Sequence, residues 1–209
     1  MHRVLPGLLL LILGALGCNR EPARPSLVLV VIDTLRADHV GAYGYPRPTT
    51  PRLDELAARG ARFSAAHAST SWTLPSVVSM LTGTYPAEHG VDMADASLNE
   101  KRATITTVLQ AAGYETAAFS ANVAFVTDAQ GIAHGFDHFE TVVPAGEDPF
   151  NGGAGADRVT DAALAWLGSR TKPRVPYFLY VHYFDPHGPY HPPKEYAARL
   201  GVAPRSPSR

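Results

Sequence analysis

The apolar run "SLVLVVID" at residues 26–33 most limits what this chain can fold into. It is rich in β-branched residues and shows no polar alternation, which is typical of a strand buried in a parallel sheet. Similar segments follow at 114–121 ("YETAAFSA") and 176–184 ("PYFLYVHYF"), and helical patterns separate them. Strands that alternate with helices predict an α/β domain with a mainly parallel sheet and helices on both faces.

The predicted helices lie within residues 49–63, 75–83, 104–113 and 157–169. In the first helix, Thr50 is placed to act as the N-cap, Pro51 suits the first turn and Gly60 ends the helix. Gly113 ends the third. The apolar faces expected to pack inward are Leu53, Leu56 and Ala57 in the first helix and Ile105, Val108, Leu109 and Ala112 in the third.

Size and charge exclude some classes of partner. The 209 residues are 45% hydrophobic, which suits one globular domain. The formal net charge of -1 gives no reason to expect a nucleic-acid partner. Cys18 is the only cysteine, so no disulfide can form within the chain.

The N-terminal segment "MHRVLPGLLLLILGALGC" has the layout of a secretory signal. Its apolar run is short for a membrane span, and "LGALGC" resembles the bacterial lipoprotein box, in which the Cys is lipidated. The alternative is a plain signal peptide in which Cys18 has no role. We expect a lipoprotein signal peptide at 1–18, a tether at 19–25 and the folded part at 26–209. The protein would then be exported and anchored by its lipid on the periplasmic side of a bacterial membrane or at the cell surface.

Polar residues follow the predicted strands where each strand ends. Asp33 follows the first strand and Asn122 the second. The stretch "HYFDPHGPYHPP" follows the last, and its polar residues are His182, Asp185, His187 and His191. Ligands of open α/β sheets bind beyond the carboxyl ends of the strands. These side chains therefore mark the expected site, and Thr73 starts a helix nearby.

Each candidate has a structural alternative. Asp33 could bind a metal, or it could cap the next turn or pair with Arg36. Thr73 could be an ordinary helix cap, or it could stand at a helix N-terminus that binds a sulfate or phosphate group. An unaided Thr hydroxyl is a poor nucleophile and needs a base or a metal ion. The His-rich stretch could bind a metal or an anion, or it could be a surface turn.

The residues "LVLVVIDTLRADHVGAYGYPRPTTPRLDELAARGARFSAAHASTSWTLPSVVSMLTGTYPAEHGV" resemble the N-terminal part of sulfatases, within the alkaline-phosphatase-like superfamily. The stretches "LQAAGYETAAFSAN", "GFDHFE" and "YVHYFDPHGPYHPP" match later blocks of the family in the same order, so the resemblance covers about residues 26–196. It implies that Asp33 is a metal ligand and that Thr73 is both nucleophile and metal ligand. It also implies that His187 contacts the oxygens of the substrate, with Asn122, His182 and Asp185 as further substrate-binding candidates.

The chain departs from the family's pattern at the nucleophile. Typical sulfatases carry Cys or Ser in a Cys/Ser-x-Pro-x-Arg motif, and the residue is oxidised to formylglycine. Here the motif reads "TLPSV" from Thr73 to Val77, so we expect no formylglycine. The usual Gly-Lys-x-His segment is replaced by "SANVAF". Thr nucleophiles occur elsewhere in the superfamily, in phosphodiesterases and in phosphoethanolamine or glycerophosphate transferases.

The resemblance implies a divalent metal (calcium, zinc or manganese), and in the family a later Asp-His or Asp-Asn pair completes its site. One Asp and one Thr do not make a closed divalent site. We therefore expect a C-terminally truncated domain that is inactive by itself.

The leading hypothesis is a metal-dependent hydrolase of small-molecule, glycan or lipid esters of sulfate or phosphate. The alternatives are an envelope phosphoryl-type transferase, which would prefer an alcohol to water as acceptor, and a non-catalytic lipoprotein, which would bind little metal.

Overall fold

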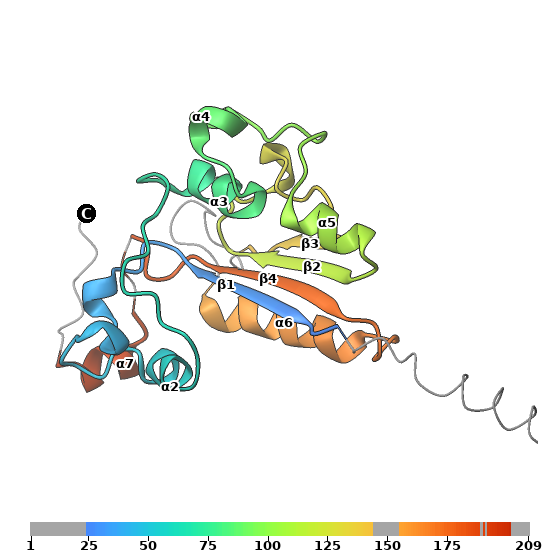
Figure 1. The fold of residues 1–209 in the computed structure, drawn as a ribbon. Coiled ribbons are helices and arrows are strands. Elements are labelled where there is room, and N and C mark those ends of the chain that lie inside the picture. Colours follow the sequence, from blue (N-terminus) through green and yellow to red (C-terminus); the bar gives the residue numbers. More distant parts are fainter. Residues whose placement is uncertain (1–23, 144–154, 189, 191, 202–209) are drawn as a thin grey trace, which may run out of the picture.

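A parallel sheet of four strands organises the chain (Figure 1). The structure is a computed structural model that describes residues 24–143, 155–188, 190 and 192–201. The strands are β1 (Leu27–Ile32), β2 (Glu115–Ser120), β3 (His138–Thr141) and β4 (Tyr177–Tyr183), in the spatial order β1-β4-β2-β3. All three pairings are parallel. The predicted parallel sheet is therefore confirmed.

The register of β4 brings three distant segments to one edge of the sheet. His182 is opposite Val31 of β1 on one side and opposite Ser120 of β2 on the other. The residues that follow β1 and β2 must then emerge beside His182, because parallel strands end at the same edge. This register places Asp33 and Asn122 within reach of His182.

Helices cover both faces of the sheet (Figure 1). On one face, α3 (Thr73–Thr82) and α5 (Ile105–Ala111) pack over a core that includes Leu74, Val78 and Tyr180. On the other face, α6 (Ala156–Ser169) packs Val159 and Ala163 onto β2 and β4. Each burial of a large apolar side chain contributes about 1.5–3 kcal/mol, so the two cores fix the strands that carry the site.

The predicted helices all form, with boundaries shifted by a few residues. They are α2 (Pro51–Arg59), α3, α5 and α6. Gly83 ends α3 in the left-handed region with φ 68°, and Gly113 follows α5 with φ 83°. Thr104 begins α5 with a capping box, in which its hydroxyl accepts a hydrogen bond from the Thr107 N–H. Thr50 precedes α2 as expected, but its side chain does not cap the helix.

Three burial predictions are wrong. The predicted buried strand β1 pairs only with β4 among the described strands, and α6 covers β2 and β4 in preference to β1. Val28 and Val30 are therefore about half exposed. Ile105 and Val108 of α5 are also exposed, because the helix turns Thr106 toward the core. Leu56 of α2 is exposed because α2 packs mainly on a short 3-10 helix and not on the sheet.

Several short elements have no counterpart in the predictions. They are β3, α4 (Pro86–His89), α7 (Lys194–Arg199) and the 3-10 helices η1 (Ala37–His39), η2 (Gly41–Tyr43) and η3 (Asp128–Gln130). Figure 1 shows α2, α7, η1 and η2 grouped beyond one end of the sheet. Among the described residues, no helix has the length and apolar character needed to cross a membrane. The expected signal peptide, Cys18 and most of the tether lie outside the described residues, as does His191.

Candidate active site

Asp33 lies at the carboxyl end of β1 and forms the centre of the site. Its backbone N–H donates to the Tyr183 carbonyl at 2.9 Å, which extends the β1–β4 ladder by one residue. The residue is 7% exposed. Thr34 follows with φ 53°, an uncommon conformation for a β-branched residue that turns the chain sharply away from the strand. The carboxylate is thus fixed by the sheet and stands at its edge.

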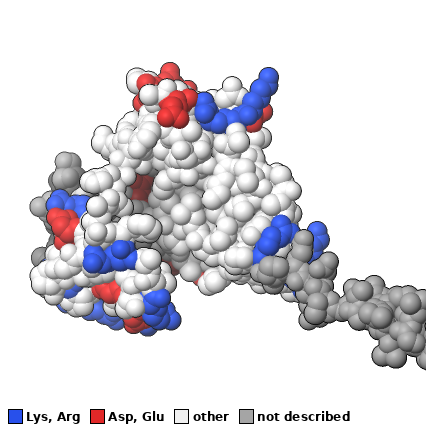
Figure 2. Space-filling model, viewed as in Figure 1, with Lys and Arg blue, Asp and Glu red and all other residues white. Residues whose placement is uncertain are grey.

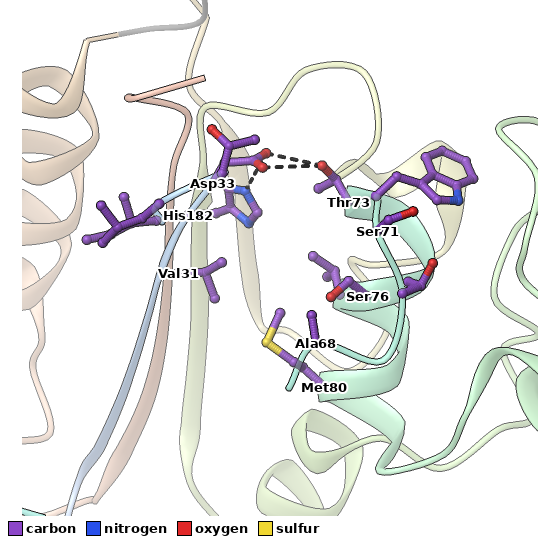
Figure 3. Close-up of a pocket in the computed structure, with 14 residues that line it drawn as sticks. Val31, Asp33, Ala68, Ser71, Thr73, Ser76, Met80 and His182 are labelled. Carbon is purple, nitrogen blue, oxygen red and sulfur yellow. Dashed lines mark hydrogen bonds and ion pairs between the residues drawn. The ribbon is translucent and has the colours of Figure 1, made fainter. Parts of the chain in front are cut away.

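Thr73 faces Asp33 from the start of α3 (Figure 3). Trp72 is the N-cap residue and Thr73 is the first residue of the helix, one position later than an N-cap. Its hydroxyl lies 3.3 Å from both Oδ1 and Oδ2 of Asp33 and donates to this carboxylate. The hydroxyl therefore donates to the Asp33 carboxylate and accepts no hydrogen bond from a backbone N–H of the helix, so the capping alternative for Thr73 is wrong.

Asn122 binds the other side of the carboxylate. Its Nδ2 donates to Asp33 Oδ2 at 2.9 Å, and its Oδ1 accepts from the backbone N–H groups of Phe125 at 2.9 Å and Ala124 at 3.3 Å. These two backbone donors fix which end of the amide faces Asp33. Asn122 is 1% exposed, so the amide is held in a single orientation. Its predicted contact with substrate stays a prediction.

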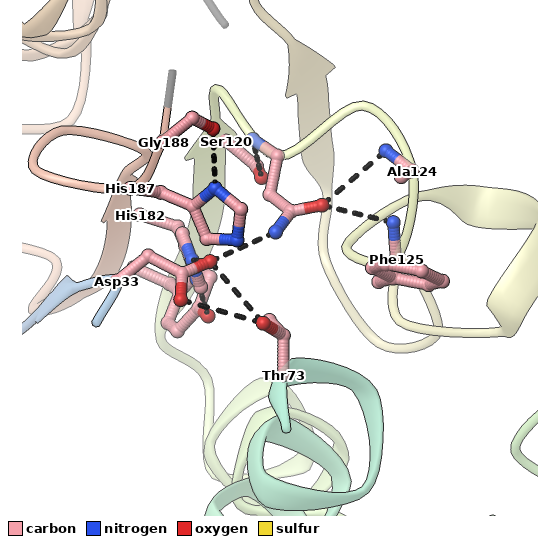
Figure 4. A network of polar contacts seen from close by, with 10 residues as sticks. Asp33, Thr73, Ser120, Ala124, Phe125, His182, His187 and Gly188 are labelled. Carbon is pink, nitrogen blue, oxygen red and sulfur yellow. Dashed lines mark hydrogen bonds and ion pairs between the residues drawn. The ribbon is translucent and has the colours of Figure 1, made fainter. Parts of the chain in front are cut away.

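His182 completes the ring of contacts around Asp33 (Figure 4). Its Nε2 lies 3.3 Å from Asp33 Oδ2, and its Nδ1 lies 2.7 Å from the Tyr180 hydroxyl. The imidazole is 1% exposed. A side chain this deeply buried can act on Asp33 directly, while its predicted role at the substrate stays a prediction.

The two other candidates of the loop after β4 have different neighbours. The ring of His187 lies 4.5 Å from that of Phe184 at an angle of 31°. Its Nδ1 donates to the Gly188 carbonyl at 2.7 Å, so the neutral form of this ring carries no hydrogen on Nε2. Figure 4 shows His187 beside Asp33 and His182. Asp185 lies at the start of α6, where its Oδ2 accepts from the Ala156 N–H at 3.1 Å. The structure thus brings His187 to the site and places Asp185 at a helix N-terminus next to it.

The surroundings of Asp33 favour its charged form. Burial alone raises the pKa of this carboxyl, but the hydrogen bonds from His182 and Asn122 and the electrostatic attraction of His182 and His187 together outweigh burial, so the pKa lies below its usual value. Asp33 therefore stays ionised at neutral pH. An ionised carboxylate with a lowered pKa is a weak base and a good ligand for a cation.

A pocket of about 290 Å³ opens in front of Asp33 and Thr73. Figure 3 shows Val31 on one side of it and Ser76, Ala68 and Met80 on the other. Among its lining residues Asp33 carries the only carboxylate, and none is Lys or Arg. Figure 2 shows the hollow as mainly uncharged surface with an acidic spot inside it.

Asp33 and Thr73 supply two adjacent oxygen donors of the kind that hard divalent cations prefer. Over the described part of the chain, no group of three or more His, Cys, Asp or Glu residues is arranged to hold a metal ion. The residues present therefore fit one side of a divalent site, whose other ligands would have to be water, substrate or residues beyond those described.

Sequence reasoning missed two contributors. Tyr180 binds His182, and Ser120 Oγ accepts from the Asn122 N–H at 3.1 Å. Tyr180 could have been found from the strand period, because it precedes His182 by two residues and so shares its face of β4. Ser120 gave no such signal, since a Ser at a strand end is common.

Comparison with known proteins gives a consistent result. A model of the sulfatase family matches residues 25–203. An N-acetylglucosamine-6-O-sulfatase of Bacteroides thetaiotaomicron is 28% identical over 87% of this chain and 35% of its own length. Human arylsulfatase A is 38% identical over 50% of this chain and 22% of its own length. The chain thus spans about a third or less of the length of these relatives.

Solved structures share the fold. The structure of BT4656 in complex with its substrate D-glucosamine-2-N,6-O-disulfate superposes with a TM-score of 0.72 at 24% identity, over 88% of this chain and 39% of that one. The phosphonate monoester hydrolase of Agrobacterium radiobacter superposes with a TM-score of 0.67 at 21% identity, over 84% and 44%. At these identities the likeness extends to the fold alone.

Proposed function

This chain belongs to the sulfatase family, and on that premise we propose that the protein is an exported, metal-dependent hydrolase of sulfuric or phosphoric esters with Thr73 as its nucleophile. One observation carries the proposal. The Thr73 hydroxyl stands at the first position of a ten-residue helix and donates to a buried, ionised Asp33. A hydroxyl held in this way is oriented toward the pocket at a point where an anionic ester group is favoured.

The start of α3 supports the choice of an anionic substrate. The first turn of a helix carries backbone N–H groups without intrahelical partners and the positive end of the helix dipole. These groups favour the negative oxygens of a sulfate or phosphate group and the charge that develops on them during attack by Thr73. His187 is the second group we assign to these oxygens, in the form that carries a hydrogen on both ring nitrogens, because Nδ1 donates to the Gly188 carbonyl and only an Nε2 that carries a hydrogen can donate to an anionic ester.

Asp33 is assigned the role of cation ligand and not that of base. Its lowered pKa makes it a weak proton acceptor, so we do not assign it the removal of the Thr73 proton. Asp33 orients the Thr73 hydroxyl and supplies a negative charge for a cation. We assign Asp33 and Thr73 to the same divalent cation, which when bound lowers the pKa of a coordinated hydroxyl and neutralises substrate oxygens. Calcium, zinc and manganese are the candidates.

Related proteins suggest the substrate class. The relatives include sulfatases named for N-acetylglucosamine and N-acetylgalactosamine, and one neighbouring structure holds a sulfated glucosamine. We propose that a sulfated or phosphorylated sugar is the physiological ester. We also propose that Cys18 anchors the exported protein through a lipid, as its sequence context predicts.

The test is made in the whole protein, because this chain is expected to be inactive by itself, and compares Thr73→Ala and Thr73→Ser with the unchanged protein on nitrophenyl sulfate and nitrophenyl phosphate, with calcium, zinc or manganese added after treatment with a chelator. We expect Thr73→Ala to lower kcat by about a thousandfold or more, as for other lost nucleophiles, and Thr73→Ser to retain part of the activity. Thr171→Ala, on the exposed segment after α6, is the matched control. Cleavage of both esters by Thr73→Ala at the original rate, or activity that no chelator affects, would refute the proposal.

Thr73 is also the observation that favours a phosphoryl-type transferase as the second candidate, because Thr nucleophiles serve in such enzymes of the superfamily. Product analysis in the presence of an alcohol separates the two functions. Transfer of the phosphoryl group to the alcohol in preference to water would identify the protein as a transferase and not a hydrolase.

A further inference from the structure

Tyr180 and His182 form a buried pair that the proposed chemistry does not use. Both side chains lie on the same face of β4, two residues apart, and both are 1% exposed or less. The Tyr180 oxygen is 2.7 Å from His182 Nδ1, and His182 Nε2 is 3.3 Å from Asp33 Oδ2. The three groups thus form a line from the core to the carboxylate.

Counting protons along this line leaves one consistent arrangement. The pKa of Tyr180 is raised by burial and by the nearby charge of Asp33, so the phenol keeps its proton at neutral pH. If Tyr180 donates to Nδ1, the neutral imidazole carries its hydrogen on Nε2 and donates to Asp33, and every group is satisfied. If Nδ1 carried a hydrogen instead, the phenolic hydrogen would have no acceptor among the described residues. A buried donor without a partner costs about 1–3 kcal/mol.

We propose that Tyr180 is a positioning residue of the site, whose hydroxyl holds His182 as the tautomer with its hydrogen on Nε2 and so keeps that hydrogen directed at Asp33. The proposal rests on the proposed function only in that Asp33 is the cation ligand to be positioned. Without the hydroxyl, Nδ1 is buried with no partner, and the ring is free to turn or to change tautomer. Asp33 then loses one of its fixed donors.

The location of Tyr180 explains why it suits this role. Its ring belongs to the core under α3, where it lies 6.2 Å from the ring of Phe136. A hydroxyl on a ring packed in this way has little freedom to move, so its hydrogen bond holds His182 in one position. Removal of a group bonded directly to a metal ligand, the position that His182 holds at Asp33, commonly changes metal affinity by about 10–100-fold, and Tyr180 acts through this group.

The first experiment reads the tautomer directly. The full chain is labelled with ¹⁵N-histidine, and the His182 resonances are identified by their loss in His182→Gln. In the unchanged protein we expect the pattern of a neutral ring with its hydrogen on Nε2, and in Tyr180→Phe a mixture of tautomers or a second ring orientation. Tyr183→Phe is the matched control, since it removes a hydroxyl of the same strand that bonds to Thr160 at 2.9 Å and should leave His182 unchanged.

Two results would overturn the proposal. One is an Nδ1-protonated or doubly protonated His182 in the unchanged protein, and this outcome needs no variant to fold. The other is a His182 spectrum in Tyr180→Phe that matches the unchanged protein. Both measurements are made without metal, so they decide the role of Tyr180 even if the proposed activity is absent.

The second experiment measures the consequence for Asp33, with Mn²⁺ alone as the probe. We expect Tyr180→Phe to weaken Mn²⁺ binding about tenfold. In a His182→Gln background the same change should have no further effect, because Gln has no imidazole ring whose tautomer Tyr180 could fix. An equal loss in both backgrounds would show that Tyr180 acts through packing and would overturn the proposal. Failure of the unchanged protein to bind Mn²⁺ would count against the proposed function and leave the tautomer result as the test of Tyr180.

Discussion

Replacing Asn122 by Asp turns the amide nitrogen, a hydrogen-bond donor to Asp33, into a carboxylate oxygen, which is a negatively charged acceptor. Oδ1 of the new carboxylate can still accept from the Phe125 and Ala124 N–H groups, so the local turn is preserved. The amide nitrogen that donates to Asp33 at 2.9 Å becomes a carboxylate oxygen. The variant therefore places two acids in contact within a buried site and changes little else.

The cost follows from the separation. Two unit charges about 3 Å apart repel by about 5 kcal/mol at an effective dielectric constant of about 20. The folded state avoids this repulsion by binding a proton that the unfolded state does not hold above about pH 5. Because the folded variant then binds more protons than its unfolded state, its free energy of unfolding falls as pH rises, by about 1.4 kcal/mol per pH unit. Between about pH 5 and about pH 8 the added destabilisation approaches 4 kcal/mol, a large part of a typical domain's stability of about 5–15 kcal/mol.

Urea unfolding at a series of pH values tests this reasoning, with a chelator present so that no cation compensates the added charge. The quantity compared is the difference in unfolding free energy between Asn122→Asp and the unchanged protein. Asn99→Asp is the matched control, because Asn99 also accepts a backbone N–H through Oδ1, from Lys101 at 2.9 Å, but lies exposed on a loop. A pH-independent difference, or the same slope in the control, would show that residue 122 does not face an ionised Asp33.

Other predictions concern residues outside the site. Burial lowers the pKa of His89, which bonds to Ser79 at 3.0 Å. Because the unfolded state then binds the proton more readily, the free energy of unfolding should fall as pH drops below about 6.5. His89→Gln should reduce this dependence in the same urea assay. Gly135→Ala should cost about 1–3 kcal/mol, because its φ is 87° and a Cβ would lie 2.9 Å from the Thr107 backbone nitrogen. Gly168→Ala, in α6 where a Cβ meets nothing within 4 Å, should stabilise the protein by about 0.5 kcal/mol and so raise its melting temperature. A higher melting temperature for Gly135→Ala than for Gly168→Ala would contradict both predictions.

The sequence predicts the class of the fold well because strand and helix patterns are local. The runs at 26–33, 114–121 and 176–184 each become a parallel strand, and glycines end helices where the left-handed conformation is needed. Burial is predicted less well, since it depends on which elements lie next to one another. Val28 is exposed although its strand is wholly apolar, because α6 packs on β2 and β4.

The members of the site could be predicted from strand ends, whereas their contacts could not. Asp33, Asn122 and His182 follow or end three strands, and the rule for parallel sheets brings them to one edge. The strand order β1-β4-β2, which puts His182 between the other two, is a property of the assembled sheet. The direction of the Thr73 hydroxyl is likewise unavailable from the sequence, since a Thr at a helix start most often serves as a cap.

The contacts of Asp33 give a physical reason to expect a cation. Its hydrogen-bond partners are an amide, a hydroxyl and an imidazole, and the pocket around it is lined by no Lys or Arg among the described residues. Hydrogen bonds orient this buried carboxylate and, together with the attraction of the nearby His182 and His187 rings, lower its pKa, but no Lys or Arg of the pocket lining neutralises its negative charge. A buried charge that no Lys or Arg neutralises is costly, and a divalent cation at Asp33 and Thr73 would relieve this cost at the position where an anionic ester must also be held. The lack of Lys and Arg in this lining predicts that cation and anionic substrate bind with positive cooperativity, since each supplies the charge that the other lacks. Asp33→Asn should remove this coupling in titrations of Mn²⁺ with and without inorganic sulfate or phosphate.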